Sequence, residues 1–123
     1  MDYSDKVLEH FIHPRNVGEI PHPSGESKVG NPACGDILWL QIKVENGTIA
    51  DVKFKTFGCC AAIASGSILT EMVKGKTIEE ALKITNRDVV DALGGLPSLK
   101  MHCSVLAQQA LRSAIENYLK KNG

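Results

Sequence analysis

The chain has 123 residues and a mass of 13.3 kDa, with 43% hydrophobic and 23% charged residues. This length and composition predict one folded domain over residues 1–123 and exclude an extensively disordered chain. Lysine plus arginine number 14, as do aspartate plus glutamate, so the net charge is zero. A neutral chain lacks the basic surface that binds nucleic acid, and we expect no nucleic-acid partner.

The first helix is predicted over about residues 4–12, with Ser4 as its cap and Pro14 ending it. Its apolar stripe consists of Val7, Leu8, Phe11 and Ile12. The acidic start of the chain does not have the pattern of a signal peptide, and no apolar run reaches the roughly 20 residues that span a membrane. We therefore expect a soluble cytoplasmic protein without a membrane partner.

A β-hairpin follows a segment rich in proline and glycine. Residues 13–35 are predicted to be mostly loop, with a short edge strand near Lys28–Val29. Apolar and polar residues then alternate over 37–44 and again over 48–57, which predicts two strands. Asn46–Gly47 lies between them, and this pair suits a tight turn because both of its residues tolerate positive φ.

Helices occupy the rest of the predicted chain. Small and apolar residues after Cys60 favour a buried helix that ends at Gly75. Thr77 and Glu80 form a capping box for the next helix, and Asn86 is expected to cap a short helix over 87–93. A last helix is expected from about residue 102 to 120. This order predicts an α+β fold, a small antiparallel sheet packed against several helices.

Three of the four cysteines lie where predicted elements end. Cys34 stands in a tight turn before the hairpin, Cys59 follows the hairpin, and Cys103 begins the last helix. Cys59 and Cys103 are near helix N-termini, where the helix dipole favours a thiolate. Asp36 and His102 lie close to them in the sequence, and thiolates with one carboxylate or imidazole suit zinc or an iron–sulfur cluster.

The remaining candidates have simpler interpretations. Cys60 is interpreted as an ordinary residue at a helix start, because adjacent side chains rarely point the same way. A thiol that stores sulfur or replaces a ligand is the alternative for Cys60. His10, His13 and His22 are interpreted as surface or capping residues rather than metal ligands.

Three separated motifs carry a family resemblance. GNPACGD, FKTFGCCAAIASGS and MHCS, in this order, resemble the cluster motifs of IscU-type iron–sulfur scaffold proteins, the family of the NifU N-terminal domain. The start YSDKVLEHFIHPRNVGEI and the segment EMVKGKTIEEA are also similar to that family. The chain differs from it at His13, where asparagine is usual, and at Cys60, where a small residue without a thiol is usual. LPSLK is a variant of the LPPVK segment that a dedicated Hsp70 chaperone binds in the family.

The resemblance implies a function and a set of site residues. It implies a scaffold and carrier, rather than an enzyme, that assembles a [2Fe–2S] cluster from iron and from the sulfur of an IscS/NifS-type cysteine desulfurase. Cys34, Cys59 and Cys103 are the implied ligands, with Asp36 or His102 as the fourth, and Cys103 is the implied acceptor of persulfide sulfur. Implied partners are acceptor apo-proteins, Hsp70 and J-type chaperones, ferredoxin and a second copy of the chain in a cluster-bearing homodimer.

Two other functions remain open from the residues. The same ligands could surround zinc in a structural or regulatory domain, and a scaffold without its cluster could also take up Zn²⁺. Alternatively, the chain could be a sulfur-accepting thiol transferase in which Cys103 acts with His102 as base. Iron-dependent and sulfide-dependent chemistry separates the scaffold from both alternatives.

Overall fold

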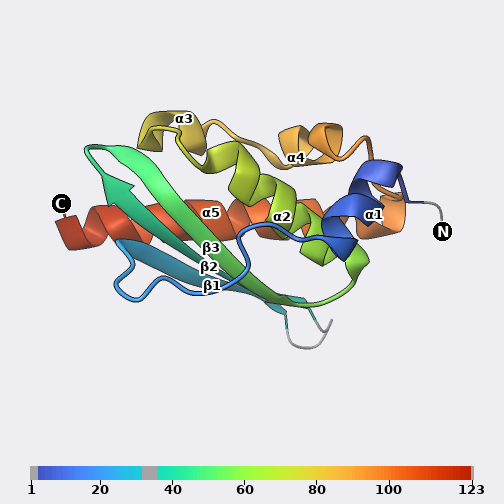
Figure 1. The fold of residues 1–123 in the computed structure, drawn as a ribbon, viewed down its shortest axis with the longest axis horizontal. Coiled ribbons are helices and arrows are strands. Elements are labelled where there is room, and N and C mark those ends of the chain that lie inside the picture. Colours follow the sequence, from blue (N-terminus) through green and yellow to red (C-terminus); the bar gives the residue numbers. More distant parts are fainter. Residues whose placement is uncertain (1–2, 32–35, 123) are drawn as a thin grey trace.

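The computed structural model describes residues 3–31 and 36–122, and Figure 1 shows their arrangement. Its elements in chain order are α1 (Asp5–Ile12), β1 (Gly25–Asn31), β2 (Asp36–Glu45), β3 (Thr48–Phe57), α2 (Cys60–Val73), α3 (Ile78–Leu82), α4 (Asn86–Ala92), the 3₁₀ turn η2 (Ser98–Lys100) and α5 (Met101–Asn122). The expected α+β class, a small antiparallel sheet with several helices, is confirmed.

The three strands form one antiparallel sheet in the order β1–β2–β3. The predicted hairpin is confirmed, and its turn residues Asn46 and Gly47 have φ values of 54° and 75°. The edge strand is longer than predicted. It has seven residues and pairs with β2 along its whole length, from Gly25 opposite Ile42 to Asn31 opposite Asp36. The prediction of mostly loop over residues 13–35 is therefore wrong for 25–31.

The core lies between the sheet and two long helices. α5 packs against β1 and β2, while α2 packs against β3 and α5 (Figure 1). Leu38, Leu40 and Ile42 point from β2 into this core and are fully buried, as the alternating pattern predicts. Most of α2 is buried as well, and its small residues allow the neighbouring elements to approach closely. The sheet and these two helices thus form the rigid base that holds the ends of the elements in place.

Of the predictions for the two short helices α3 and α4, the one for the start of α4 is wrong. The capping box of α3 is confirmed, because the Thr77 hydroxyl accepts from the Glu80 amide and the Glu80 carboxylate accepts from the Thr77 amide. α4 begins one residue earlier than predicted, and its cap is Thr85, not Asn86. Thr85 forms a second capping box with Asp88, because its hydroxyl accepts from the Asp88 amide and the Asp88 carboxylate accepts from the Thr85 amide.

The buried face of α1 is not the predicted stripe. Val7 is buried, but the exposed fractions of Leu8, Phe11 and Ile12 are 40%, 41% and 64%. The second buried residue is His10, which was expected on the surface. α1 packs on α2 through this face, because residues 7 and 10 lie one helical turn apart.

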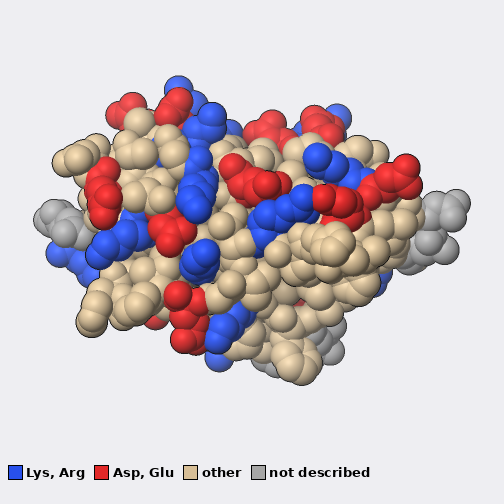
Figure 2. Space-filling view, in the orientation of Figure 1, with Lys and Arg blue, Asp and Glu red and all other residues tan. Residues whose placement is uncertain are grey.

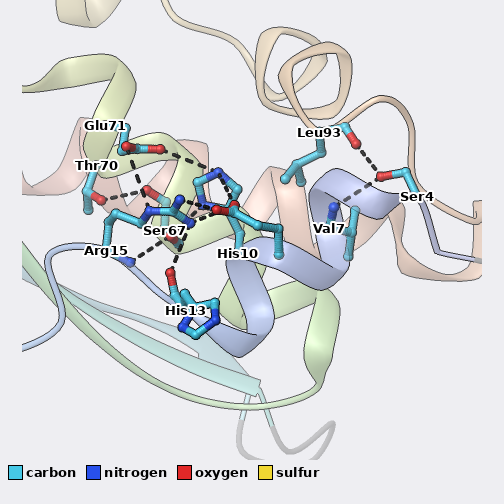
Figure 3. A network of polar contacts seen from close by, with 10 residues as sticks. Ser4, Val7, His10, His13, Arg15, Ser67, Thr70, Glu71 and Leu93 are labelled. Carbon is cyan, nitrogen blue, oxygen red and sulfur yellow. Dashed lines mark hydrogen bonds and ion pairs between the residues drawn. The ribbon is translucent and has the colours of Figure 1, made fainter.

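A polar network explains how His10 is accommodated (Figure 3). Its Nδ1 atom lies 2.7 Å from the Ser67 hydroxyl, which also accepts the backbone N–H of Arg15 at 2.9 Å. Its Nε2 atom has no hydrogen-bond partner among the described residues, although a Glu71 oxygen lies 3.4 Å away. Burial lowers the pKa of His10, and the Arg15 cation lowers it further, so the neutral imidazole is favoured.

The surface is electrostatically mixed on the face that Figure 2 shows, where basic and acidic side chains alternate over short distances. Ion pairs that join elements at the surface include Arg15 with Glu9, Lys55 with Glu19, and Lys74 with Asp51. Within residues 3–31 and 36–122, no helix is both long enough and apolar enough to cross a bilayer.

Candidate metal and thiol site

Three segments that are distant in the sequence meet at one end of the sheet. Asp36 is the first residue of β2, Cys59 is the N-cap of α2, and His102 and Cys103 lie in the first turn of α5. The ligand atoms of Asp36, His102 and Cys103 all lie within 4.8 Å of one another. The structure therefore brings together four of the five residues that the sequence singled out, while Cys34 lies outside the described residues.

The distances within the site are short enough for a shared ion. The Cys59 and Cys103 sulfur atoms are 3.7 Å apart, and His102 Nε2 lies 3.6 Å from the Cys103 sulfur. His102 Nε2 is also 3.0 Å from Asp36 Oδ2. An ion that binds here replaces these contacts with bonds of about 2.0–2.3 Å to sulfur, nitrogen or oxygen, so the side chains need only small movements.

The two thiols differ in access. Cys103 is fully buried, whereas Cys59 is partly exposed and the His102 side chain is 53% exposed. Burial raises the pKa of Cys103 to about 12, and the neighbouring Cys59 and Asp36 add to this effect. The expectation that a helix N-terminus favours the thiolate is therefore wrong for Cys103 in the metal-free protein. Desolvation outweighs the dipole here, and a bound metal ion would supply the missing positive charge.

Local backbone structure directs Cys59 toward Cys103. The Cys59 carbonyl accepts the amides of Ala62 and Ile63 at the start of α2, but the side chain makes no capping hydrogen bond. The preceding residue, Gly58, packs directly on Asp36, because a Cβ built there would lie 2.6 Å from Asp36 Oδ1. The absence of that side chain lets the Asp36 carboxylate lie beside the Cys59 segment.

The other sequence candidates lie elsewhere. Cys60 is the first residue of α2, is partly buried and packs against the hydrophobic core. Burial also raises the pKa of its thiol. His10 is held in the α1–α2 network, while His13 and His22 are exposed and outside the group of ligand atoms.

Sequence reasoning missed two neighbours of the site. Tyr3 packs against the small cluster that contains Cys103, and burial raises the pKa of its phenol. Lys100 is the last residue of η2, and the negative charge of Cys59 raises the pKa of its ammonium group. In the sequence, the only indication for Lys100 was its position three residues before Cys103. If the last helix begins before the predicted residue 102, this spacing places Lys100 and Cys103 one helical turn apart.

The fold is that of a recognisable family. The chain belongs to the NifU-like N-terminal domain family, whose model matches residues 2–123. It is 62% identical over 121 residues to the iron–sulfur cluster assembly scaffold protein IscU 1 of Archaeoglobus fulgidus, covering 98% of this chain and 79% of that protein. It is 53% identical over 124 residues to IscU of Aquifex aeolicus, covering 99% and 79%.

Longer relatives and solved structures agree with this assignment. The chain is 56% identical over 126 residues to the nitrogen fixation protein NifU of Nostoc, covering 95% of this chain and 42% of that protein. A NifU-like protein from Brucella abortus has a TM-score of 0.80 at 18% identity, covering 96% and 94% of the two chains. The SUF-system scaffold protein from Fervidobacterium islandicum has a TM-score of 0.75 at 22% identity, covering 92% and 96%. At these identities the two structures establish the shared fold.

Proposed function

We propose that this chain is a scaffold on which a [2Fe–2S] cluster is assembled and from which the cluster passes to acceptor proteins. The observation that carries the proposal is the convergence of two thiols, an imidazole and a carboxylate from three segments of the chain, with the two sulfur atoms 3.7 Å apart. The names of the curated relatives, which are cluster assembly scaffolds, support the same function.

The proposed ligands are Cys34, Cys59 and Cys103, with Asp36 or His102 as the fourth. Three thiolates match the preference of iron–sulfur clusters for soft sulfur donors. A carboxylate or imidazole is a weaker fourth ligand for the cluster, and this weakness favours release to an acceptor. His102 and Asp36 are already hydrogen-bonded to each other, so whichever one binds iron leaves the other in position to orient it.

The proposed sulfur acceptor is Cys103. Its thiolate attacks the outer sulfur of a persulfide on the cysteine desulfurase, the new S–S bond forms on Cys103, and the desulfurase cysteine leaves as a thiolate. A ferredoxin-type donor then supplies two electrons that reduce the transferred sulfur to sulfide. Because Cys103 is fully buried, this step requires a local opening of the site when the partner binds.

The remaining parts of the proposal concern the carrier role, the domain organisation, the partners, the cellular location and the oligomeric state. The chain acts as a carrier rather than as an enzyme, and residues 1–123 form one domain. Its partners are an IscS/NifS-type desulfurase, acceptor apo-proteins, and Hsp70 and J-type chaperones that read the LPSLK segment, all in the cytoplasm. Two copies form a homodimer when the cluster is bound.

Zinc is a second occupant that the donor set favours. Two cysteines with a histidine and an aspartate resemble known zinc ligand sets, so the cluster-free protein is expected to bind Zn²⁺. A structural zinc domain differs from a scaffold in one respect, because removal of its metal should unfold it. A thiol transferase would accept sulfur at Cys103 and need no iron.

The test is anaerobic reconstitution of the purified chain with ferrous iron and sulfide or a desulfurase. Iron and acid-labile sulfide in near-equal amounts, a visible chromophore and transfer to an apo-ferredoxin are the expected results. Cys103→Ser should abolish sulfur acceptance and cluster yield, whereas the neighbouring Cys60→Ser should leave both largely intact. Failure of wild-type protein to form the cluster, together with retained zinc and zinc-dependent folding, would contradict the scaffold function.

A further inference from the structure

The face of the sheet that is turned away from α2 and α5 carries a pocket of about 290 Å³. Successive residues of a strand point to opposite faces, so Trp39 and Gln41 point away from the core that contains Leu38 and Leu40. Trp39 and Gln41 both line the pocket and are partly buried. A volume at the lower end of the range for small-molecule sites suits a ligand with the size of an amino acid.

A segment of the chain before β1 crosses this face and forms the rim of the pocket. Gly18 donates its N–H to the Phe54 carbonyl of β3 at 3.1 Å, and Ile20 donates its N–H to Gln41 Oε1 at 2.6 Å. The second bond fixes the carboxamide of Gln41, whose NH₂ group can still donate to a ligand. The pocket is therefore formed before any ligand enters it.

An acidic and a basic side chain border the pocket from opposite sides. Glu26 of β1, Gln41 of β2 and Lys53 of β3 are register neighbours and form one row across the sheet. Lys55 is paired with Glu19 at 2.7 Å, but neither Glu26 nor Lys53 forms an ion pair with another residue of 3–31 and 36–122. Their backbones are two strand spacings apart, about 10 Å, so their charged ends can reach the ammonium and the carboxylate of one small ligand.

Trp39 adds an apolar surface beside this charged row. It lies two residues from Gln41 on β2 and therefore on the same face of the sheet. The ammonium group of Lys28, its neighbour on β1, lies 5.6 Å from the centre of the indole ring, and this cation–π contact helps to hold the ring in place. An apolar or aromatic group of a ligand can pack against the indole.

We propose that this pocket binds a free α-amino acid, with its ammonium group at Glu26, its carboxylate at Lys53 and Gln41, and its apolar side chain against Trp39. This inference goes beyond the scaffold function and does not depend on it. The pocket is distinct from the thiol site, because Gln41 lies five residues along β2 from Asp36, about 17 Å at 3.4 Å per residue.

Trp39 is the only tryptophan in the chain, so its fluorescence reports binding at the pocket directly. L-Leucine is titrated into the purified chain at low salt. Isocaproate, which lacks the ammonium group, and leucinamide, which lacks the carboxylate, are titrated in parallel. We expect a saturable change with leucine, with a dissociation constant on the order of 1 mM, and about two- to fivefold weaker binding of each analogue, because partly exposed charge pairs contribute little.

Two variants assign the two ends of the ligand. Glu26→Gln and Lys53→Gln should each weaken leucine binding about two- to fivefold. Glu26→Gln should leave isocaproate binding unchanged, and Lys53→Gln should leave leucinamide binding unchanged, because each variant removes a contact that the analogue does not make. The controls are Glu45→Gln and Lys83→Gln, which change the same charges at exposed residues outside the pocket and should bind leucine as the wild type does.

Three results would overturn the inference. The first is the absence of a saturable change with leucine, both in the fluorescence of Trp39 and in the NMR shifts of the Trp39 and Gln41 amides. The second is equal binding of leucine and isocaproate, which would show an anion site that makes no use of Glu26. The third is unchanged leucine affinity in both pocket variants. Thermal unfolding of the variants should match that of the wild type, and the titration needs no cluster, so a failed reconstitution would leave its result intact.

Discussion

Replacing Gly58 by alanine should impair the site more than the fold. The added Cβ would lie 2.6 Å from Asp36 Oδ1 and 3.0 Å from the Ala62 Cβ. Gly58 has no positive φ that would strain an alanine, so the whole effect is steric. The Asp36 side chain can rotate away, whereas Ala62 is fixed in α2. We expect the carboxylate to leave its position 3.0 Å from His102 Nε2, and the free energy of unfolding to fall by about 1 kcal/mol.

The expected loss in metal affinity follows from the role of Asp36. If this carboxylate binds the ion or orients His102, its displacement should weaken Co²⁺ or Zn²⁺ binding about tenfold, the lower end of the range for residues that support metal ligands. Tenfold corresponds to about 1.4 kcal/mol. The assay is a competition titration with a chelator, with urea unfolding of the metal-free protein measured in parallel.

A double-mutant cycle tests this reasoning for Gly58. In an Asp36→Ala background the carboxylate is absent, so Gly58→Ala should cause no further loss of metal affinity. An unchanged affinity in the Gly58→Ala single variant would refute the steric argument. An equal additional loss in the Asp36→Ala background would show that Gly58 acts on another part of the site.

Further predictions concern α2 and the α1–α2 network. Gly66→Ala would place a Cβ 2.6 Å from the Phe54 ring, and the overpacking should lower the free energy of unfolding by about 1–2 kcal/mol in urea unfolding, even after the gain in helix propensity. Ser65→Ala, one residue earlier, should be neutral or stabilising in the same assay, because it removes a buried hydroxyl that has no hydrogen-bond partner among the described residues. The pKa of His10 is lowered by burial, so the unfolded chain takes up a proton near pH 6.5 before the folded chain does. The free energy of unfolding should therefore fall as the pH drops below about 6.5, and in His10→Gln it should fall less; an identical pH dependence in the two proteins would contradict this assignment.

The sequence predicted those elements whose signals are local. The hairpin followed from strict alternation on both sides of Asn46–Gly47, and the α3 cap from the spacing of Thr77 and Glu80. α1 was less predictable because it has two candidate faces. Hydropathy selects the face with Leu8, Phe11 and Ile12, but α2 presents Ser67 and Glu71, which fit the polar side chain of His10. Such a choice depends on the partner helix, which no local pattern reveals.

The site was predictable in its members but not in its chemistry. The motifs identified Asp36, Cys59, His102 and Cys103, and the fold brings them together. The high pKa of Cys103 could not be predicted, because it arises from burial by segments distant in the sequence. The position of Lys100 likewise depends on the 3₁₀ turn that precedes α5.

The direction of α5 has a practical consequence for anyone who attaches a tag, a fluorophore or another domain. α5 contains Cys103 in its first turn and runs to Asn122 at the opposite end of the molecule (Figure 1). Its 22 residues span about 33 Å at 1.5 Å per residue. An attachment after α5 therefore starts far from the thiols, whereas one placed before Tyr3 starts beside the packing cluster of Cys103 and would hinder any protein that docks there.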